Sequence, residues 1–563
     1  MDLLRAHFLT TLKKAVSYWE QAVNAQGRKS TTNTFISLCA IYILSALFVI
    51  IVGPVPQNIY GHDTPLLFDG AWRILQGQIP NADFHSALGP LTFLVIALGM
   101  KISSLSVNSI TYAIVIISLP ALALSWVSAY RKTSAFYSFL FCLFIIFTLI
   151  GTHYPGNRIS DTTYSGYYNR FASAYFFILL LETCLPDRTN LSTGIEKWND
   201  ALSGIIVGIC FAFLFFIKIS YFGMACFAIV FSIYIVKRSN PILWIIYVFF
   251  GVGFISIPMI FYLKMGIIHY FRDLQLAASA RLSFPMVMLI RILVAFFRNY
   301  FFIGCMGLFI WMWNTCNVVT KKKLFLTVGF LVTISLIIFS TNSVVPGPEK
   351  ELPTLAIPMF ITLEYTRRSD ALNQFKINFS NRLIWWFSSQ IGLILILVFI
   401  IRDIASFAYT VYWRFNTLPN VTKAERFQSK ALYDLINTSP NFPFKNMEVT
   451  QSSYTELVND GLSLLKENIS NSDRVTVLDF TNPFCFGLLQ PSPQGDALWW
   501  DVNFTFSKDA FVSAKEIFST VTVVMVNRYS IESDAIMEVY QDYVFQHYRL
   551  KVQSKFWDLY ILK

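Results

Sequence analysis

The stretch that decides the fold is Tyr60–Leu91, YGHDTPLLFDGAWRILQGQIPNADFHSALGPL, which follows an apolar run of membrane-spanning length. It holds three aspartates, two of the six histidines of the chain, one arginine and no lysine. A loop that only joins two membrane helices does not need this cluster of polar groups. We therefore interpret the stretch as the first wall of an active site at a membrane surface.

Outward from this stretch, the composition predicts a polytopic membrane protein. Apolar residues make up 55% of the chain and charged residues only 14%, whereas about a quarter of the residues of a soluble protein are charged. Apolar runs of about 17–25 residues, each enough for one membrane helix, recur along most of the chain. The predicted fold is an α-helical polytopic membrane protein with 11–13 transmembrane helices, an odd total, and a small C-terminal α/β domain.

The composition predicts three regions along the chain. They are a cytoplasmic N-terminal tail (1–32), a transmembrane catalytic module (33–411) and a soluble extracytoplasmic α/β domain (412–563). Spans are expected near 33–55, 89–104, 108–128, 134–151, 171–186, 201–219, 221–236, 241–264, 299–314, 323–341, 353–364 and 385–409. Hydrophobic periodicity in the last region predicts helices at 453–469 and 530–547, buried strands at 474–480 and 520–527, and a final pair of strands.

Charge patterning indicates the sides of the membrane. A net charge of +11 would suggest nucleic acid for a soluble domain, but in membrane proteins Lys and Arg mark cytoplasmic loops, so no nucleic-acid partner is expected. Basic clusters occur at 131–132, 237–238, 321–323 and 367–368. Two full crossings between Gly89 and Tyr130 would put Arg131 outside, so either 89–128 crosses an odd number of times or this cluster breaks the rule. The segments placed outside are 60–91, 152–169, 265–298, 342–352 and the C-terminal domain.

Two segments are expected to lie at the membrane surface. Residues 64–77 place apolar side chains at helical spacing, which predicts a helix lying flat in the interface; Asp69 and Arg73, four residues apart, are expected to pair with each other. Residues 265–298 mix charge and apolar groups and read as interfacial helices. The segment 481–501 is too apolar for a free loop, so we expect it to lie on the membrane part and help to roof the site.

Several polar residues could carry chemistry. Asp63, beside His62, could act as a general base at the membrane surface; the alternative is a solvated loop acid. Asp83 and His85 precede a span and could instead cap its start. Lys218 lies between apolar runs, and the alternative is the tip of a hairpin between two spans.

The segment YNR at 168–170 lies at the mouth of a predicted span. Arg170 could grip a phosphate, and Tyr168 and Asn169 could bind phosphate or sugar oxygens. The alternative is an aromatic belt with a snorkelling arginine. Glu351 could bind a ligand or simply begin a helix after Pro348.

The order of these features resembles the polytopic GT-C glycosyltransferases, which use lipid-linked sugars. The resemblance is carried by Asp63 directly after the first span, a flat helix ending in G-x-x-P at 77–80, DF at 83–84 and Gly-Pro-Leu at 89–91. The motifs YNR at 168–170, KISY at 218–221, ELP at 351–353 and W-x-L-Y at 557–560 look like the bacterial, mannosyltransferase-like members. The first-loop acid of the family maps onto Asp63; Thr64 follows it, so Asp83 or Asp161 could fill the place of the usual second acid.

The resemblance implies transfer of a sugar from a polyprenyl-phosphate donor to a hydroxyl of a glycan or lipid acceptor, with inversion. Asp63, and secondarily Asp83, would be catalytic, and Arg170 and Lys218 would hold the phosphate. The remaining substrate-binding residues would be His62, His85, Tyr168, Asn169, Tyr221 and Glu351. No cofactor is expected, and nothing in the sequence supports a divalent metal. The expected location is the bacterial cytoplasmic membrane.

Three other functions fit parts of the sequence. A transporter or flippase needs charges near the membrane midplane and paired broken helices, and Lys218 is the only candidate for such a charge. A non-enzymatic scaffold leaves the outside acids unexplained. A polymerase of lipid-linked glycans stays open.

Overall fold

The computed structural model describes most of the chain outside a central segment. The described residues are 28–154, 158–186, 193–281 except 237 and 239, three residue pairs between 326 and 334, 379–416, 418–422, 425–438, 445 and 453–563. Glu351, the predicted spans at 299–314 and 353–364, most of the span at 323–341 and the basic clusters at 321–323 and 367–368 lie outside these residues.

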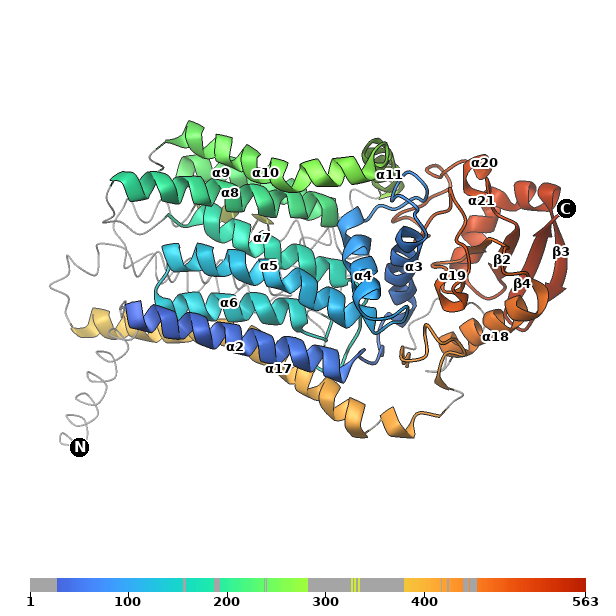
Figure 1. The fold of residues 1–563 in the computed structure, drawn as a ribbon, viewed down its shortest axis with the longest axis horizontal. Helices are drawn as coiled ribbons and strands as arrows, with labels where there is room; N and C mark the ends of the chain where they lie inside the picture. Colours follow the sequence, from blue (N-terminus) through green and yellow to red (C-terminus); the bar gives the residue numbers. More distant parts are fainter. Residues whose placement is uncertain are drawn as a thin grey trace.

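Long helices run side by side along most of the molecule (Figure 1). They are α2 (Arg28–Val52), α5 (Ser109–Lys132), α6 (Ala135–Ile150), α7 (Tyr167–Cys184), α8 (Thr193–Ile217), α9 (Ile219–Ile235), α10 (Pro241–Leu263) and α17 (Phe379–Asn416). Among the described residues, four of these helices, α2, α5, α8 and α10, are long and apolar enough to cross a membrane. Large apolar side chains such as Phe249 and Phe261 are exposed on α10, which suits contact with lipid. The chain is a multi-pass membrane protein of the predicted helical class.

Two short helices lie across the end of the bundle that faces the C-terminal domain (Figure 1). The first, α3 (Thr64–Leu75), is the predicted flat helix, and it ends before Gly77, whose positive φ of 86° stops it. The second, α4 (Pro90–Ile102), has 13 residues, a length of about 20 Å at 1.5 Å per residue that is too short for a bilayer core of about 30 Å.

Both ends of α4 lie at the same end of the bundle. The Gly89 N–H donates to the Ile217 carbonyl at the end of α8 (3.0 Å), and the Val107 N–H donates to the Ala431 carbonyl of the C-terminal region (3.0 Å). A Cβ at Gly89 would lie 2.2 Å from the Phe216 carbonyl oxygen, so only glycine permits this approach. The predicted span at 89–104 is therefore wrong: α4 is apolar because it is buried beneath α3, and the single crossing in this region is α5.

This correction removes the conflict over the basic pair at the end of α5. Arg131 and Lys132 lie at the end of the bundle away from the C-terminal domain, where both reach Glu182 on α7, at 3.0 and 3.4 Å. Lys132 also donates to the Leu185 carbonyl. One crossing between Gly89 and Tyr130 thus places this cluster opposite the 60–91 stretch, as the charge pattern requires.

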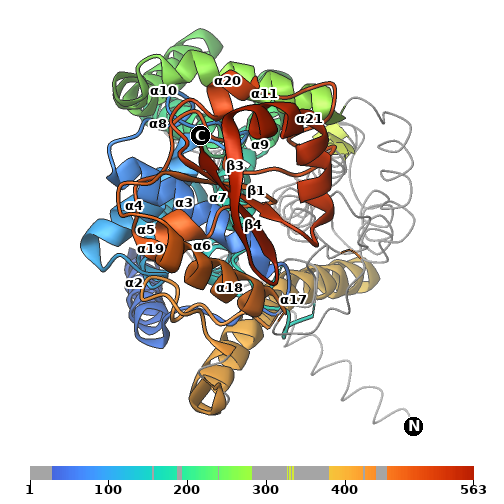
Figure 2. The same ribbon diagram turned by 90° about the vertical axis from the view of Figure 1, so that its right-hand side faces the viewer.

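The C-terminal region forms a four-stranded sheet with helices on both faces (Figure 2). Its elements are α18 (Ser453–Asn468), β1 (Val475–Leu478), α19 (Phe484–Leu488), α20 (Ala514–Ile517), β2 (Val523–Asn527), α21 (Ile531–His547), β3 (Tyr548–Gln553) and β4 (Trp557–Leu562). The strand order is β1-β2-β4-β3, with β1 and β2 parallel and the other pairs antiparallel. Every residue of β1 and β2 is buried, because α18 covers one face and α21 the other. The predicted helices and strands of this α/β domain are confirmed.

The domain is held on the bundle by a buried ion triad. Arg73 on α3 lies between Asp69 (3.0 Å) and Asp496 of the C-terminal domain (2.9 Å), and all three side chains are almost fully buried. Arg73 also donates to the Pro493 carbonyl at 2.6 Å. The predicted Asp69–Arg73 pair is confirmed, as is the contact of the 481–501 segment with the membrane part; the role of Asp496 was not predicted.

Candidate active site

Asp63 lies at the end of the bundle that carries the C-terminal domain, in a single 3₁₀ turn, η1 (Gly61–Asp63), just before α3. The Ser165 hydroxyl donates a hydrogen bond to Oδ2 of Asp63. His62 Nε2 lies 3.4 Å from Oδ1, and the Asp63 side chain is 26% exposed. The carboxylate is therefore oriented by its neighbours yet still open on one side.

Gln57 joins the Asp63 turn to the segment before α7. Its Oε1 accepts hydrogen bonds from the hydroxyls of Thr64 and Thr163, both at 3.0 Å, and from the Tyr164 N–H at 2.7 Å. A Cβ at Gly61 would lie 2.2 Å from Asn437 Oδ1, so glycine lets the turn close against the C-terminal side of the chain. The prediction that the 60–91 stretch and the YNR segment share one end of the bundle is confirmed.

His62 is held by the C-terminal domain. Its ring meets the edges of Phe480 and Tyr454, with centroids 5.1 and 6.2 Å away, and the Thr481 hydroxyl donates to the His62 carbonyl at 3.0 Å. Burial lowers the pKa of His62, and the nearby Asp63 carboxylate only partly offsets this. The imidazole is thus neutral near pH 7 and buttresses Asp63 without neutralising it.

A lysine contacts the same end of α7. Lys218 stands between α8 and α9, its Nζ donates to the Asn169 side-chain oxygen, and it lies 4.8 Å from the centre of the Tyr168 ring. Ser165 lies two residues before α7, and Asn169 lies in its first turn. Carboxylate and ammonium therefore both contact the chain at the N-terminus of α7, which itself favours anions.

Arg170 points into the helix bundle instead. It is 4% exposed, lies 3.3 Å from Asp403 on α17, and donates to the carbonyls of Thr148 and His153. These contacts tie α6, α7 and α17 together. A phosphate could bind Arg170 only if these contacts broke, so Arg170 is assigned to packing and not to phosphate binding.

Tyr221 also has a packing role. It is fully buried, its hydroxyl lies 2.8 Å from the Ser173 hydroxyl, and its ring meets Phe176 edge-on. The contact joins α9 to α7 behind Lys218, so it steadies the hairpin tip from which Lys218 projects.

Asp83 and His85 bind other groups than Asp63. Asp83 Oδ2 accepts the Ile79 N–H at 2.7 Å and so closes the turn after α3. His85 Nδ1 lies 2.8 Å from Asp273 on α11 (Gly266–Arg281), and Nε2 lies 3.1 Å from Glu516 of the C-terminal domain. His85 thus belongs to the junction between α11 and that domain.

Two charged residues near the site were not predicted individually. Arg281, the last residue of α11, donates to the Phe504 carbonyl at 3.0 Å and stacks on the Phe504 ring; burial lowers its pKa to about 10, so it stays charged at neutral pH. Burial, with Glu532 and Asp63 adding negative charge, raises the pKa of Asp501 to about 8. The signals were present: Asp501 ends the apolar 481–501 segment, and Arg281 lies in the mixed 265–298 segment.

Asp501 is expected to make stability depend on pH. Its carboxyl ionises near pH 4 in an unfolded chain but only near pH 8 in the folded protein, so the folded state binds more protons in this window and stability falls as pH rises from about 4 to 8. Asp501→Asn should remove this loss and raise the free energy of unfolding at pH 8 by up to about 5 kcal/mol, with little change at pH 4.5. Thermal unfolding of the full-length protein in lipid nanodiscs at both pH values measures this; an equal effect at both would contradict it.

No group of three or more His, Cys, Asp or Glu side chains is placed to hold a metal ion within the described ranges.

Comparison with known proteins gives only a distant structural likeness. No protein-family profile and no curated protein matches the chain. The fold is similar to the crystal structure of ArnT from Cupriavidus metallidurans bound to undecaprenyl phosphate, with a TM-score of 0.43, 9% identity, and coverage of 94% of this chain and 98% of ArnT. It is similar to apo ArnT from the same organism, with a TM-score of 0.44, 10% identity, and coverage of 93% and 98%. At this distance no residue role carries over.

Proposed function

We propose that the protein is a membrane glycosyltransferase that moves a sugar from a polyprenyl-phosphate donor to an acceptor hydroxyl. The observation that carries this proposal is that an oriented carboxylate, Asp63, and a cation, Lys218, both contact residues at the start of α7, at the membrane end of a soluble domain. A base and a cationic phosphate clamp are the two groups that this transfer needs.

Asp63 is the base of the proposed reaction. It takes the proton of the acceptor hydroxyl as the oxygen attacks the anomeric carbon. The bond from that carbon to the phosphate oxygen breaks on the opposite face, so the anomeric configuration inverts. The leaving lipid phosphate needs no proton near neutral pH, so no second catalytic acid is required, and we assign Asp83 to the turn and not to the chemistry.

The donor phosphate is held at the hairpin tip between α8 and α9. Lys218 supplies the charge, Tyr168 and Asn169 flank it, and Arg281 approaches from α11. Charge that develops on the leaving phosphate is stabilised by cations fixed beforehand in a site of low dielectric. Lys218 thus lies at a helix tip and not at the membrane midplane that a transporter would need.

The same arrangement implies a location. The basic pair at 131–132 lies at the end of the bundle away from the site, and such pairs favour the cytoplasm. We therefore place the site and the C-terminal domain on the extracytoplasmic face of a bacterial cytoplasmic membrane. The acceptor is a hydroxyl of a glycan or lipid at that face.

Lys218 is expected to set donor affinity. Lys218→Met should raise the donor KM at least about 10-fold, because a charge-assisted hydrogen bond is worth about 1.5–3 kcal/mol. Lys218→Arg should retain part of the affinity, since the charge remains. The measurement is transfer from a labelled polyprenyl-phosphate sugar by membranes that hold each variant, and Lys551→Met, on the far side of the C-terminal domain, is the matched control. Unchanged donor KM in Lys218→Met would remove the proposed clamp.

The overall proposal is tested with the same assay. Membranes that hold the native protein should transfer the labelled sugar, and membranes with Asp63→Asn should not. Movement of intact donor lipid across the bilayer without transfer would indicate a flippase, and linkage of whole lipid-linked repeats to one another would indicate a polymerase.

A further inference from the structure

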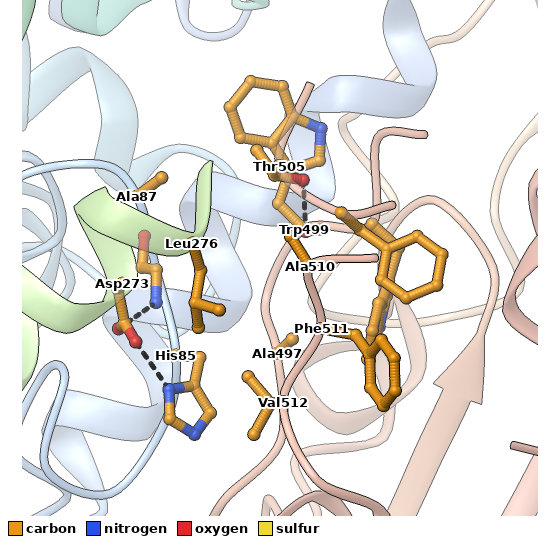
Figure 3. A pocket seen from close by; sticks show the side chains of 13 residues that line it. His85, Ala87, Asp273, Leu276, Ala497, Trp499, Thr505, Ala510, Phe511 and Val512 are labelled. Carbon is orange, nitrogen blue, oxygen red and sulfur yellow. Dashed lines mark hydrogen bonds and ion pairs between the residues drawn. The ribbon is translucent and has the colours of Figure 1, made fainter. Parts of the chain in front are cut away.

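A pocket lies between α11 and the C-terminal domain. Figure 3 shows its two walls: one is formed by the loop before α4 and by α11, the other by the segment 497–512. It has about 40 Å³ of space, enough for about three waters, and Phe511 at its rim is 43% exposed. Pockets at domain junctions that combine aromatic walls with a few polar groups are the usual form of a small-molecule site.

The pocket is lined by rings on one wall and by hydrogen-bonding groups on the other. The aromatic lining residues are Trp499, Trp500, Phe506 and Phe511. Trp500 and Phe506 meet edge-on at 5.4 Å, and the indole N–H groups of both tryptophans are buried and donate no hydrogen bond within the protein. Trp499 and Phe511 are only partly buried, so these two rings offer accessible aromatic surface at the pocket.

The polar wall is built and fixed before any ligand arrives. Asp273 holds His85 Nδ1 at 2.8 Å with one oxygen and accepts from Asn81 and the Ser86 N–H with the other, at 2.7 and 3.0 Å. Glu516 holds the second nitrogen of His85 at 3.1 Å. These groups come from both the membrane part and the soluble domain, so the wall exists only when the two are docked.

Aromatic rings connect this pocket to the proposed base. Trp499 meets Phe480 at 6.3 Å, and Phe480 meets His62, the neighbour of Asp63, at 5.1 Å. The donor cannot be the occupant, because its lipid tail must stay in the bilayer beside α8 and α9, whereas the pocket faces the soluble domain. The attacking alcohol must instead reach Asp63, to which the contacts of Trp499, Phe480 and His62 connect this pocket.

We propose that this pocket takes one edge of a sugar ring of the acceptor while the rest of the ring lies outside it, so that the acceptor is a saccharide. Aromatic faces match the C–H faces of a pyranose, and Ser86, Thr505 and Asp273 at the pocket serve its hydroxyls. The acceptor role rests on the proposed function; the saccharide site itself does not.

The test is direct binding, without any transfer reaction. Full-length protein in lipid nanodiscs is titrated with the methyl glycosides of glucose, mannose, galactose and N-acetylglucosamine, and saturation transfer from protein to each glycoside is measured by NMR. At least one glycoside should bind. The signal should fall at least about fivefold in Phe511→Ala, which removes a stacking ring, and in Ala87→Phe, which fills the pocket. Phe545→Ala, an exposed phenylalanine on α21 outside the pocket, should leave it unchanged.

The outcomes separate this site from the proposed function. The assignment would be overturned if the native protein binds no glycoside, or if it binds inorganic phosphate in place of a glycoside. It would also be overturned if both pocket variants bind glycoside as well as the native protein does. Each of these outcomes counts whatever the transfer assay gives. Glycoside binding that is lost in the folded, monodisperse Ala87→Phe variant supports the saccharide site even if the native protein transfers no sugar, in which case only the proposed function fails.

Discussion

Replacement of Asp63 by asparagine is expected to lower the rate of sugar transfer by about 10²–10⁴-fold, the range that a positioned general base contributes. Asparagine keeps the size of the side chain and can still accept the hydrogen bond from Ser165, so the fold should survive. It cannot take a proton from the acceptor hydroxyl. The donor KM should stay within about twofold of the native value, because the proposed phosphate site at Lys218 is untouched.

The informative comparison is with Asp83→Asn. Both aspartates lie in the 60–91 stretch, and both are partly exposed. The Asp83 carboxylate, however, accepts a hydrogen bond from the Ile79 N–H, and an asparagine oxygen can accept the same bond. We expect near-native transfer from Asp83→Asn and almost none from Asp63→Asn, measured in parallel with the labelled donor. Equal loss in the two variants, or undiminished transfer by Asp63→Asn, would reject the assigned base.

The sequence predicted the elements of this fold better than their contacts. The flat helix α3 and the strands of the C-terminal domain follow from the spacing of apolar residues. A helix with one buried face shows apolar residues at helical spacing, and a strand buried on both faces shows a short continuous apolar run. The stretch 89–104 misled because burial under another helix and burial in lipid call for the same apolar side chains. Only length and the partners of its two ends distinguish α4 from a membrane span.

The sequence alone indicates some residues of the candidate site and not others. Asp63 and Lys218 stand out as charged groups beside apolar runs, and this signal is local. Ser165, which orients Asp63, and Asp501, whose pKa Asp63 helps to raise, have no distinctive sequence context. Ser165 is 102 residues from Asp63 in the chain, and Asp501 belongs to the C-terminal domain. Only folding brings them close to Asp63. Arg170 misled for the converse reason: an arginine at a helix mouth looks the same whether it meets a phosphate or, as here, a buried carboxylate on α17.

Arg73→Met is expected to be the most destabilising substitution in the junction, at about 3–5 kcal/mol, the usual result of breaking a buried ion pair from one side. It leaves the carboxylates of Asp69 and Asp496 buried without a cation. Burial already raises the pKa of Asp69 to about 6 with Arg73 present and raises that of Asp496 as well; without Arg73 both should rise further. Folded-state pKa values above the unfolded ones mean that stability falls as pH rises, so the defect should be larger at pH 8 than at pH 5.

Activity should report the same event, because α3 directly follows Asp63 and undocking of the domain also frees His62 from Thr481. Thermal unfolding in nanodiscs and transfer activity, each at pH 5 and pH 8, measure the two effects. Lys508→Met, which removes one partner of the exposed Lys508–Glu538 pair, should change neither, since solvent screens such pairs. Addition of Asp69→Asn and Asp496→Asn to Arg73→Met should recover much of the stability at pH 8, because no charge is then left buried. If the single variant is as stable as the native protein, the triad does not hold the domain in place, and docking depends on other contacts, such as those of Thr481 with His62 and Glu516 with His85.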